Sequence, residues 1–134
     1  MLGEKIAEGR GKVTTRRVLQ NPSGGPKMET SFEAAGKLLG VEFKETGTYW
    51  SAVRPDGTLY GEGQGILMGK KGEMATWVGQ GMGTIKEDGG VSYRGAVYYQ
   101  SSSEAWLRLN RVASVFEFEV DAEGNSHAEL WEWK

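Results

Sequence analysis

The sequence predicts an all-β protein that folds as a single eight-stranded antiparallel up-and-down β-barrel, with one short helix before the last two strands. Residues typical of turns recur at short intervals between runs of strand-like residues, the pattern expected of a barrel. Glycine occupies every second position from Gly61 to Gly65 and again from Gly79 to Gly83. Because successive side chains of a strand point to opposite faces, each of these strands has one bare face, which is typical of a sharply curved sheet. The chain contains 21 Gly but only 3 Pro, a composition that suits a turn-rich β protein.

Length and composition narrow the class of protein further. With 134 residues and a mass of 14.7 kDa, the chain is expected to form one domain over residues 1–134. Its net charge of -2 argues against general nucleic-acid binding, which requires a basic surface. The absence of cysteine excludes disulfides, thiolate metal sites and a cysteine nucleophile. The segment Met1–Arg10 mixes charge with glycine and no long apolar run follows, so we expect no membrane span and a cytoplasmic location.

The strands are expected in order along the chain, each ending at a turn that contains Gly, Pro or Asp. The turn at Leu38-Leu39 is the exception and depends on the following Gly40. The other turns are predicted at residues 22–26, 54–57, 69–72, 87–90 and 122–124. The strands between them are predicted at residues 5–19, 28–37, 41–53, 58–68, 73–85, 91–100, 112–120 and 126–133.

One interruption between strands differs from a turn. Ser101 precedes Glu104 by three residues, and an apolar run with Trp106, Leu107 and Leu109 follows. This spacing is typical of a capping box, so a short helix is predicted to begin there. We expect its apolar side chains to plug one end of the barrel, with a mobile lid over a ligand as the alternative.

Loop length determines which residues of neighbouring strands pair, and pairing determines which side chains share a face. The simplest closure of each turn pairs Gly36 with Val41, Val53 with Thr58, Met68 with Glu73, and Ile85 with Val91. One face then collects aromatic and aliphatic side chains, and the other collects charged ones. In this arrangement Gly61, Gly63 and Gly65 point outward. The glycines expected to point inward, and to leave room in the lumen, are Gly47, Gly79, Gly81, Gly83 and Gly95.

The predicted inner face carries the candidate ligand-binding residues. Small barrels either fill their lumen with side chains or hold one small ligand there. Binding pockets are mainly apolar, with a few polar groups that orient the ligand. The residues expected to line such a pocket are Phe32, Phe43, Tyr60, Gln64, Trp77, Tyr93, Phe116 and Phe118.

Three further residues on the predicted inner face are candidates for catalysis: Glu62, Glu45 and Tyr49. In the predicted register Glu62 faces an apolar lumen, and loss of hydration there would raise its pKa toward neutrality. Glu62 could then act as a general acid or base, assisted by Tyr49 or Gln64. The alternatives are a buried polar cluster that satisfies its own hydrogen bonds, or a cavity mouth where Glu62 meets water. Glu45 could equally lie at the rim and be solvated.

Other charged residues are not assigned to a site. The only histidine, His127, lies beside a turn and is interpreted as a surface residue, so no metal site and no cofactor are predicted. The basic segment that contains Arg10, Lys12, Arg16 and Arg17 is interpreted as a solvated strand face, with anion contact as the alternative.

The layout of the chain resembles that of small bacterial barrels whose function is uncharacterised, similar to the allene oxide cyclase and calycin barrels. The resemblance rests on the eight successive strands, the Gly-rich central hairpins, and the stretch from Leu107 to Ala113 that leads into Phe116-Glu117-Phe118. It implies an apolar lumen and frequent oligomerisation. In the cyclase barrels the lumen binds an oxidised fatty acid and a glutamate guides ring closure; no motif assigns that role here to Glu45 or Glu62.

Three functions are therefore carried forward. The first is binding of a small, mostly apolar molecule in the lumen. The second is cofactor-free isomerisation or cyclisation by a lumenal glutamate. The third is a structural barrel that acts through its exterior as a homo-oligomer.

Overall fold

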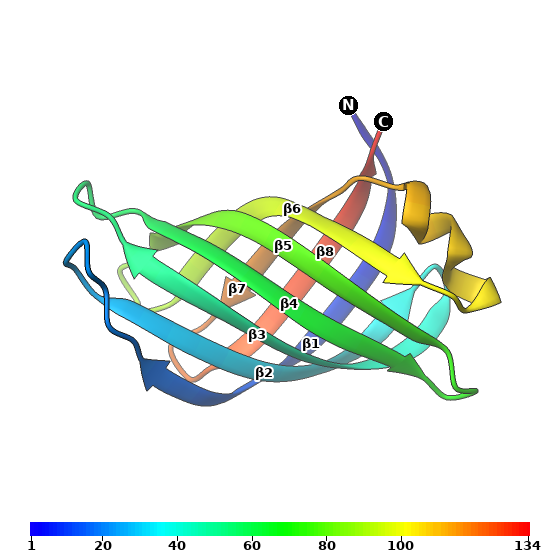
Figure 1. The fold of residues 1–134 in the computed structure, drawn as a ribbon, viewed down its shortest axis with the longest axis horizontal. Helices are drawn as coiled ribbons and strands as arrows, with labels where there is room; N and C mark the ends of the chain where they lie inside the picture. Colours follow the sequence, from blue (N-terminus) through cyan, green and yellow to red (C-terminus); the bar gives the residue numbers. More distant parts are fainter.

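The chain forms a closed antiparallel barrel in which each strand pairs with the next and β8 pairs back with β1 (Figure 1). A computed structural model describes all residues from Met1 to Lys134. Both chain ends lie at the same end of the barrel, where the main chains of Met1 and Lys134 exchange hydrogen bonds. The elements are β1 (Leu2–Val18), β2 (Lys27–Leu38), β3 (Val41–Val53), β4 (Leu59–Gly69), β5 (Met74–Ile85), β6 (Val91–Ser101), the 3-10 helix η1 (Glu104–Arg111), β7 (Ser114–Val120) and β8 (Asn125–Trp133).

Four of the hairpins share one loop geometry, in which three residues end on a glycine. In the β3–β4 hairpin the main-chain N–H of Arg54 donates to the carbonyl of Thr58, and that of Gly57 donates to the carbonyl of Arg54. Gly57 has a φ of +86°, in the left-handed region that favours glycine. This is a type I turn followed by a glycine bulge, which adds one residue to the loop. The corresponding glycines of the other three loops are Gly72, Gly89 and Gly124.

This loop geometry overturns part of the predicted register. Val53 pairs with Leu59 and not with Thr58, and Met68 pairs with Met74 and not with Glu73. Each loop contains one more residue than the simplest closure allows. The two shifts of one residue cancel, so β4 alone has its faces exchanged relative to the prediction.

The remaining pairings leave the predicted faces unchanged. Leu38 pairs with Val41 across a two-residue turn in which Leu39 and Gly40 both have positive φ. The predicted partner of Val41 was Gly36, two residues before the observed one. A shift of two residues leaves each side chain on the predicted face of the sheet. Ile85 pairs with Val91 as predicted.

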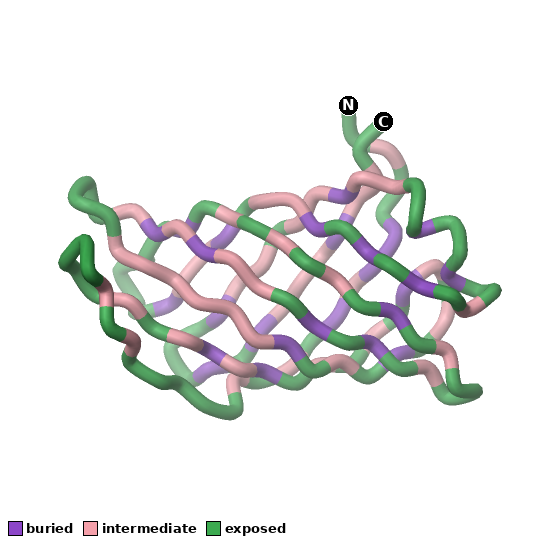
Figure 2. The backbone as a smooth tube through the Cα atoms, in the orientation of Figure 1, coloured by how far each residue is buried: buried purple, intermediate pink, exposed green.

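Burial along the strands confirms the alternation of faces. On β3, Phe43 is 6% exposed while its neighbours Glu42 and Lys44 are exposed. Figure 2 shows buried positions recurring along the strands, separated by more exposed ones. The predicted inner face of β3 is therefore correct.

The glycines of β4 face the lumen, so their predicted outward orientation was wrong. They accommodate bulky neighbours on the inside. A Cβ atom on Gly65 would lie 2.3 Å from the indole Nε1 of Trp77, and one on Gly63 would lie 2.7 Å from the Cβ of Tyr49. The glycines of both β4 and β5 therefore face the lumen. This leaves more space there than the predicted arrangement, in which the glycines of β5, but not those of β4, faced inward.

The helix η1 closes one end of the barrel, as Figure 1 shows. Trp106 and Leu109 are fully buried in the core, and the indole Nε1 of Trp106 donates to the carbonyl of Leu38 at 3.0 Å. Asn110 exchanges two hydrogen bonds of 2.8 Å with the main chain of Ser101. The favoured plug role is thus consistent with the packing, whereas Leu107 remains exposed on the outer side.

The predicted capping box was wrong. The residue that caps the helix is Ser103, which makes no side-chain capping hydrogen bond. The Ser101 hydroxyl instead donates to the carbonyl of Met74 on β5 at 2.6 Å. This serine therefore joins the ends of two strands.

No helix of the structure has the length and apolar character needed to cross a membrane.

Candidate functional site

The interior of the barrel contains a cavity of about 100 Å³. Its wall is mostly apolar and combines rings, small side chains and bare glycine main chain. The single carboxyl side chain that projects into it belongs to Glu45. The principal lining residues are Ala7, Gly9, Phe32, Ala34, Phe43, Glu45, Tyr49, Gly61, Gly63, Leu67, Trp77, Gly79, Gly81, Tyr93, Val97, Tyr99, Phe116, Phe118, Ser126, Ala128 and Leu130.

Four rings pack together on the side of the cavity away from the helix. The ring of Tyr49 lies 6.1 Å from that of Phe32, 5.7 Å from that of Tyr93 and 5.8 Å from that of Phe118, between ring centroids. The contacts with Tyr93 and Phe118 are edge-on, the arrangement that aromatic quadrupoles favour. All four residues are predicted pocket or catalytic residues, and the fold brings them together.

Glu45 is the polar centre of the cavity. Its Oε2 accepts a hydrogen bond of 2.7 Å from the indole Nε1 of Trp77. Burial raises the pKa of the Glu45 carboxyl from its ordinary 4.5 to about 7, and the hydrogen bond from Trp77 opposes part of that rise. This carboxyl is therefore poised to change its protonation state near neutral pH. Of the two positions left open for Glu45, the structure shows the one on the inner face and not the solvated one at the rim.

The phenol groups around the cavity stay protonated. Burial raises the pKa of Tyr99 above its ordinary value, and the nearby charge of Glu45 raises it further. Burial likewise raises the pKa of Tyr49, although a hydrogen bond with Thr30 and the charge of Arg16 lower it in part. These phenols can donate hydrogen bonds to a guest molecule without acting as bases.

Three predicted site residues lie on the outer surface, because the faces of β4 are exchanged. The Tyr60 hydroxyl donates to Oε2 of Glu62 at 2.6 Å, and the ring of Tyr60 packs edge-on against Trp50. Gln64 is exposed. The main chain of Glu62 borders the cavity between its two bare neighbours, but its side chain points away. The prediction that the side chains of Tyr60, Glu62 and Gln64 face the lumen was wrong. Glu62 therefore cannot act as a catalytic residue inside the lumen.

The sequence interpretation also missed part of the cavity wall. Strands β1 and β8 contribute small inner residues, among them Gly9 and Ala128. Alternation of small residues in β1, at Ala7, Gly9 and Gly11, was the signal that could have placed this side of the lumen.

One cluster on the outer surface of β1 and β8 has the residue types of a metal site. Oxygen or nitrogen atoms of Glu8, His127 and Glu129 lie within 4.8 Å of one another. However, the ammonium of Lys5 lies 2.7 Å from Glu8 and 2.6 Å from Glu129. The lysine already forms ion pairs with both carboxylates, so a metal ion would have to displace it.

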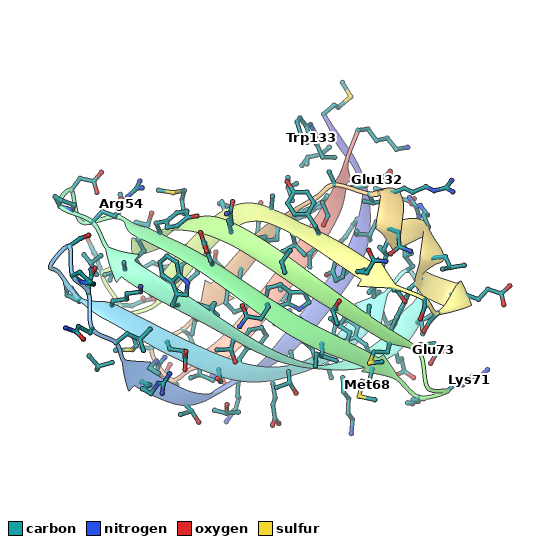
Figure 3. The ribbon with its side chains drawn as sticks, viewed as in Figure 1. Arg54, Met68, Lys71, Glu73, Glu132 and Trp133 are labelled. Carbon is teal, nitrogen blue, oxygen red and sulfur yellow. The ribbon has the colours of Figure 1, made fainter.

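The two ends of the barrel differ in character. Figure 3 shows Arg54 at the end opposite to Lys71 and Glu73. The end marked by Lys71 and Glu73 is the one that η1 closes, whereas hairpin loops surround the end marked by Arg54. We refer to the latter as the loop end.

The same barrel occurs in proteins of very different sequence. No protein-family model and no curated protein sequence matches this chain. A conserved protein of unknown function from Rhodopseudomonas palustris shares 9% identity with it at a TM-score of 0.83, covering 98% of this chain and 97% of that chain. A protein with unknown function from Clostridium acetobutylicum ATCC 824 shares 12% identity at a TM-score of 0.82, covering 96% of each chain. A beta-barrel like protein from Acinetobacter baumannii AYE shares 12% identity at a TM-score of 0.83, covering 100% of this chain and 96% of that chain. These likenesses establish the fold, and the lumen residues of this chain must support any function.

Proposed function

We propose that the barrel binds a small, mostly apolar molecule in its lumen. The observation that supports this most directly is the cavity of about 100 Å³ lined by rings and bare glycine main chain. An apolar cavity of about 150 Å³ is large enough to bind benzene or xenon. The lumen cavity is smaller than that, so the part of a ligand that fits inside it without rearrangement has at most the bulk of one small ring. Glu45 and the phenols supply the few polar groups that would orient it.

Filling the cavity should abolish this binding. Ala34 lines the lumen, whereas its neighbour Ala35 is exposed on the outer face of the same strand. We expect Ala34→Leu to weaken binding of 3-phenylpropan-1-ol at least tenfold in isothermal titration calorimetry. If the leucine prevents the burial of even two CH₂ groups of the ligand, the binding free energy falls by about 1.6 kcal/mol. A loss of about 1.4 kcal/mol already corresponds to a tenfold weaker affinity.

The matched control is Ala35→Leu, which should bind the alcohol as the wild type does. Circular dichroism must show that both variants are folded, because overpacking an interior costs about 1–3 kcal/mol. If Ala34→Leu does not fold, Ala128→Leu fills the cavity from β8 instead. Equal binding by a folded lumen-filling variant and the wild type would contradict a lumenal site.

A second candidate function is cofactor-free isomerisation or cyclisation, with Glu45 as the general acid or base. The pKa of about 7 for Glu45 favours it, since proton transfer is most effective when the pKa lies near the working pH. The resemblance to the allene oxide cyclase barrels points to the same chemistry. Native mass spectrometry of the purified protein would identify a co-purified substrate. Catalysis requires that Glu45→Gln loses turnover of that compound while still binding it.

The exterior supports a homo-oligomer as a third proposal. One outer face across β4, β5 and β6 is largely uncharged. Glu62 and Arg94 border it beside Gln80 and Met82, so two copies could meet over the rest of the face with little like-charge repulsion. Val78 and Tyr98 are more than half exposed at its centre. A molar mass of one chain, measured by light scattering at micromolar concentration, would contradict this proposal. The face consists of Gln64, Ile66, Met68, Met74, Thr76, Val78, Gln80, Met82, Ala96, Tyr98 and Gln100.

A further inference from the structure

A β-bulge in β1 changes which basic side chain faces the lumen. Up to Val13, which pairs with Phe32, the side chains of β1 alternate regularly between the two faces. The register then shifts between Val13 and Thr15, so the strand contains one residue that has no partner. After the bulge Arg16 pairs with Thr30; without it, Arg16 would pair with Glu29.

The partner of Arg16 decides where its side chain points. Directly paired residues of neighbouring strands project to the same face. Thr30 is 6% exposed and pairs in turn with Tyr49, whose ring lines the cavity. Arg16 therefore lies on the inner face, in the same row as Thr30 and Tyr49, at the loop end of the barrel.

Arg16 has no ion-pair partner, in contrast to its neighbour. Arg17 on the outer face lies 3.3 Å from the carboxylate of Glu29. Arg16 makes no salt bridge with any acidic residue of the chain. The carboxyl of the inner face, that of Glu45, is bound by the indole of Trp77 and lies on the same strand as Tyr49 but four residues closer to the helix end. The guanidinium of Arg16 is thus available to a ligand.

Two phenols connect Arg16 with the cavity. The rings of Tyr49 and Tyr93 border the cavity, and the charge of Arg16 lowers the pKa of both phenol groups against the larger effect of burial. The Tyr93 hydroxyl is held by the Ser51 hydroxyl at 2.7 Å. A ligand with a ring in the cavity and an anionic group at Arg16 would pass along these two side chains.

We propose that Arg16 binds the carboxylate of the lumenal ligand, so that the natural ligand is a small apolar monocarboxylate. This inference rests on the proposed binding function of the lumen. Guanidinium groups bind carboxylates through charge-assisted, often bidentate hydrogen bonds. The apolar part of the ligand would fill the space between the rings and the glycines of β4 and β5.

A pair of probes with one ring tests the proposal. 3-Phenylpropanoate and 3-phenylpropan-1-ol differ only in the carboxylate that Arg16 would bind. At pH 7.5 and low salt we expect the wild type to bind the carboxylate about tenfold more tightly than the alcohol. In Arg16→Gln that preference should disappear, while the affinity for the alcohol stays the same. Added salt should reduce the preference in the wild type, because the guanidinium is exposed.

The matched control is Arg17→Gln, which removes a neighbouring positive charge from the outer face and should keep the preference. If the alcohol binds but Arg16→Gln retains the preference, or the wild type shows none, the role of Arg16 is wrong and the lumenal site stands. If neither probe binds the folded wild type, the proposed lumenal function fails together with this inference.

Discussion

The free energy of unfolding is expected to fall by about 2–3 kcal/mol between pH 5 and pH 8, because of one residue, Glu45. Burial raises the pKa of this carboxyl in the folded protein to about 7 from its ordinary 4.5. In that range the folded state holds a proton that the unfolded chain has already released. The stability that this proton provides is complete below pH 4.5 and is lost as the pH rises through 7.

Replacing Glu45 by Gln should remove this dependence. The glutamine keeps the size of the side chain and an oxygen that can accept the hydrogen bond from Trp77. At pH 8 the variant should therefore be more stable than the wild type by about 3 kcal/mol, and at pH 5 the difference should be less than about 1 kcal/mol. Urea denaturation followed by circular dichroism at each pH measures both values.

The control for Glu45→Gln is Glu33→Gln, which changes an exposed carboxyl on the outer face of β2. Its pH profile should match that of the wild type. The carboxyls whose pKa is lowered by their partners, such as Glu8 and Glu119, titrate below pH 5 and do not interfere. An unchanged fall in stability in Glu45→Gln would show that Glu45 is not buried as described.

Replacing Trp106 by Ala should cost about 3–5 kcal/mol of stability, the range observed when large buried aromatic side chains are removed. Trp106 is fully buried where η1 closes the barrel, and its indole satisfies the carbonyl of Leu38. The substitution would leave a cavity at the end of the core and a carbonyl without its donor. Chemical denaturation monitored by far-ultraviolet circular dichroism gives the difference without relying on tryptophan fluorescence.

Two variants separate packing from other effects of this substitution. Leu107→Ala changes an exposed side chain next to Trp106 and should alter stability by less than about 0.5 kcal/mol. Trp106→Phe keeps a buried ring but loses the N–H donor, so it should fall between the wild type and Trp106→Ala. If Trp106→Ala is as stable as Leu107→Ala, the helix is a loosely attached lid and the plug interpretation is wrong.

Much of the architecture was predictable because strands have a side-chain period of two. The alternation of Phe43 with charged neighbours on β3 was sufficient to identify its inner face, and the glycine-rich hairpins indicated a curved, closed sheet. Eight of the eleven predicted site residues line the lumen: Phe32, Phe43, Glu45, Tyr49, Trp77, Tyr93, Phe116 and Phe118.

The failure at β4 has a local cause. Each loop beside β4 ends on a glycine in the left-handed conformation, at Gly57 and Gly72, and each contains one residue more than the simplest closure. Both loops have the same pattern of two residues followed by glycine, and this pattern is typical of the longer, bulged turn. The shift of one residue moved Glu62 from the predicted lumen to the outer surface.

The sequence by itself determined the fold class, the order of the strands and the inner face of most of them, since these follow from periodicity and turn residues along the chain. Only the tertiary structure decided which carboxyl and which arginine face the lumen. Glu45 owes its raised pKa to residues from several strands, and Arg16 faces inward because of one extra residue in β1. The physical reason is that an insertion of a single residue reverses the face of everything after it until another compensates.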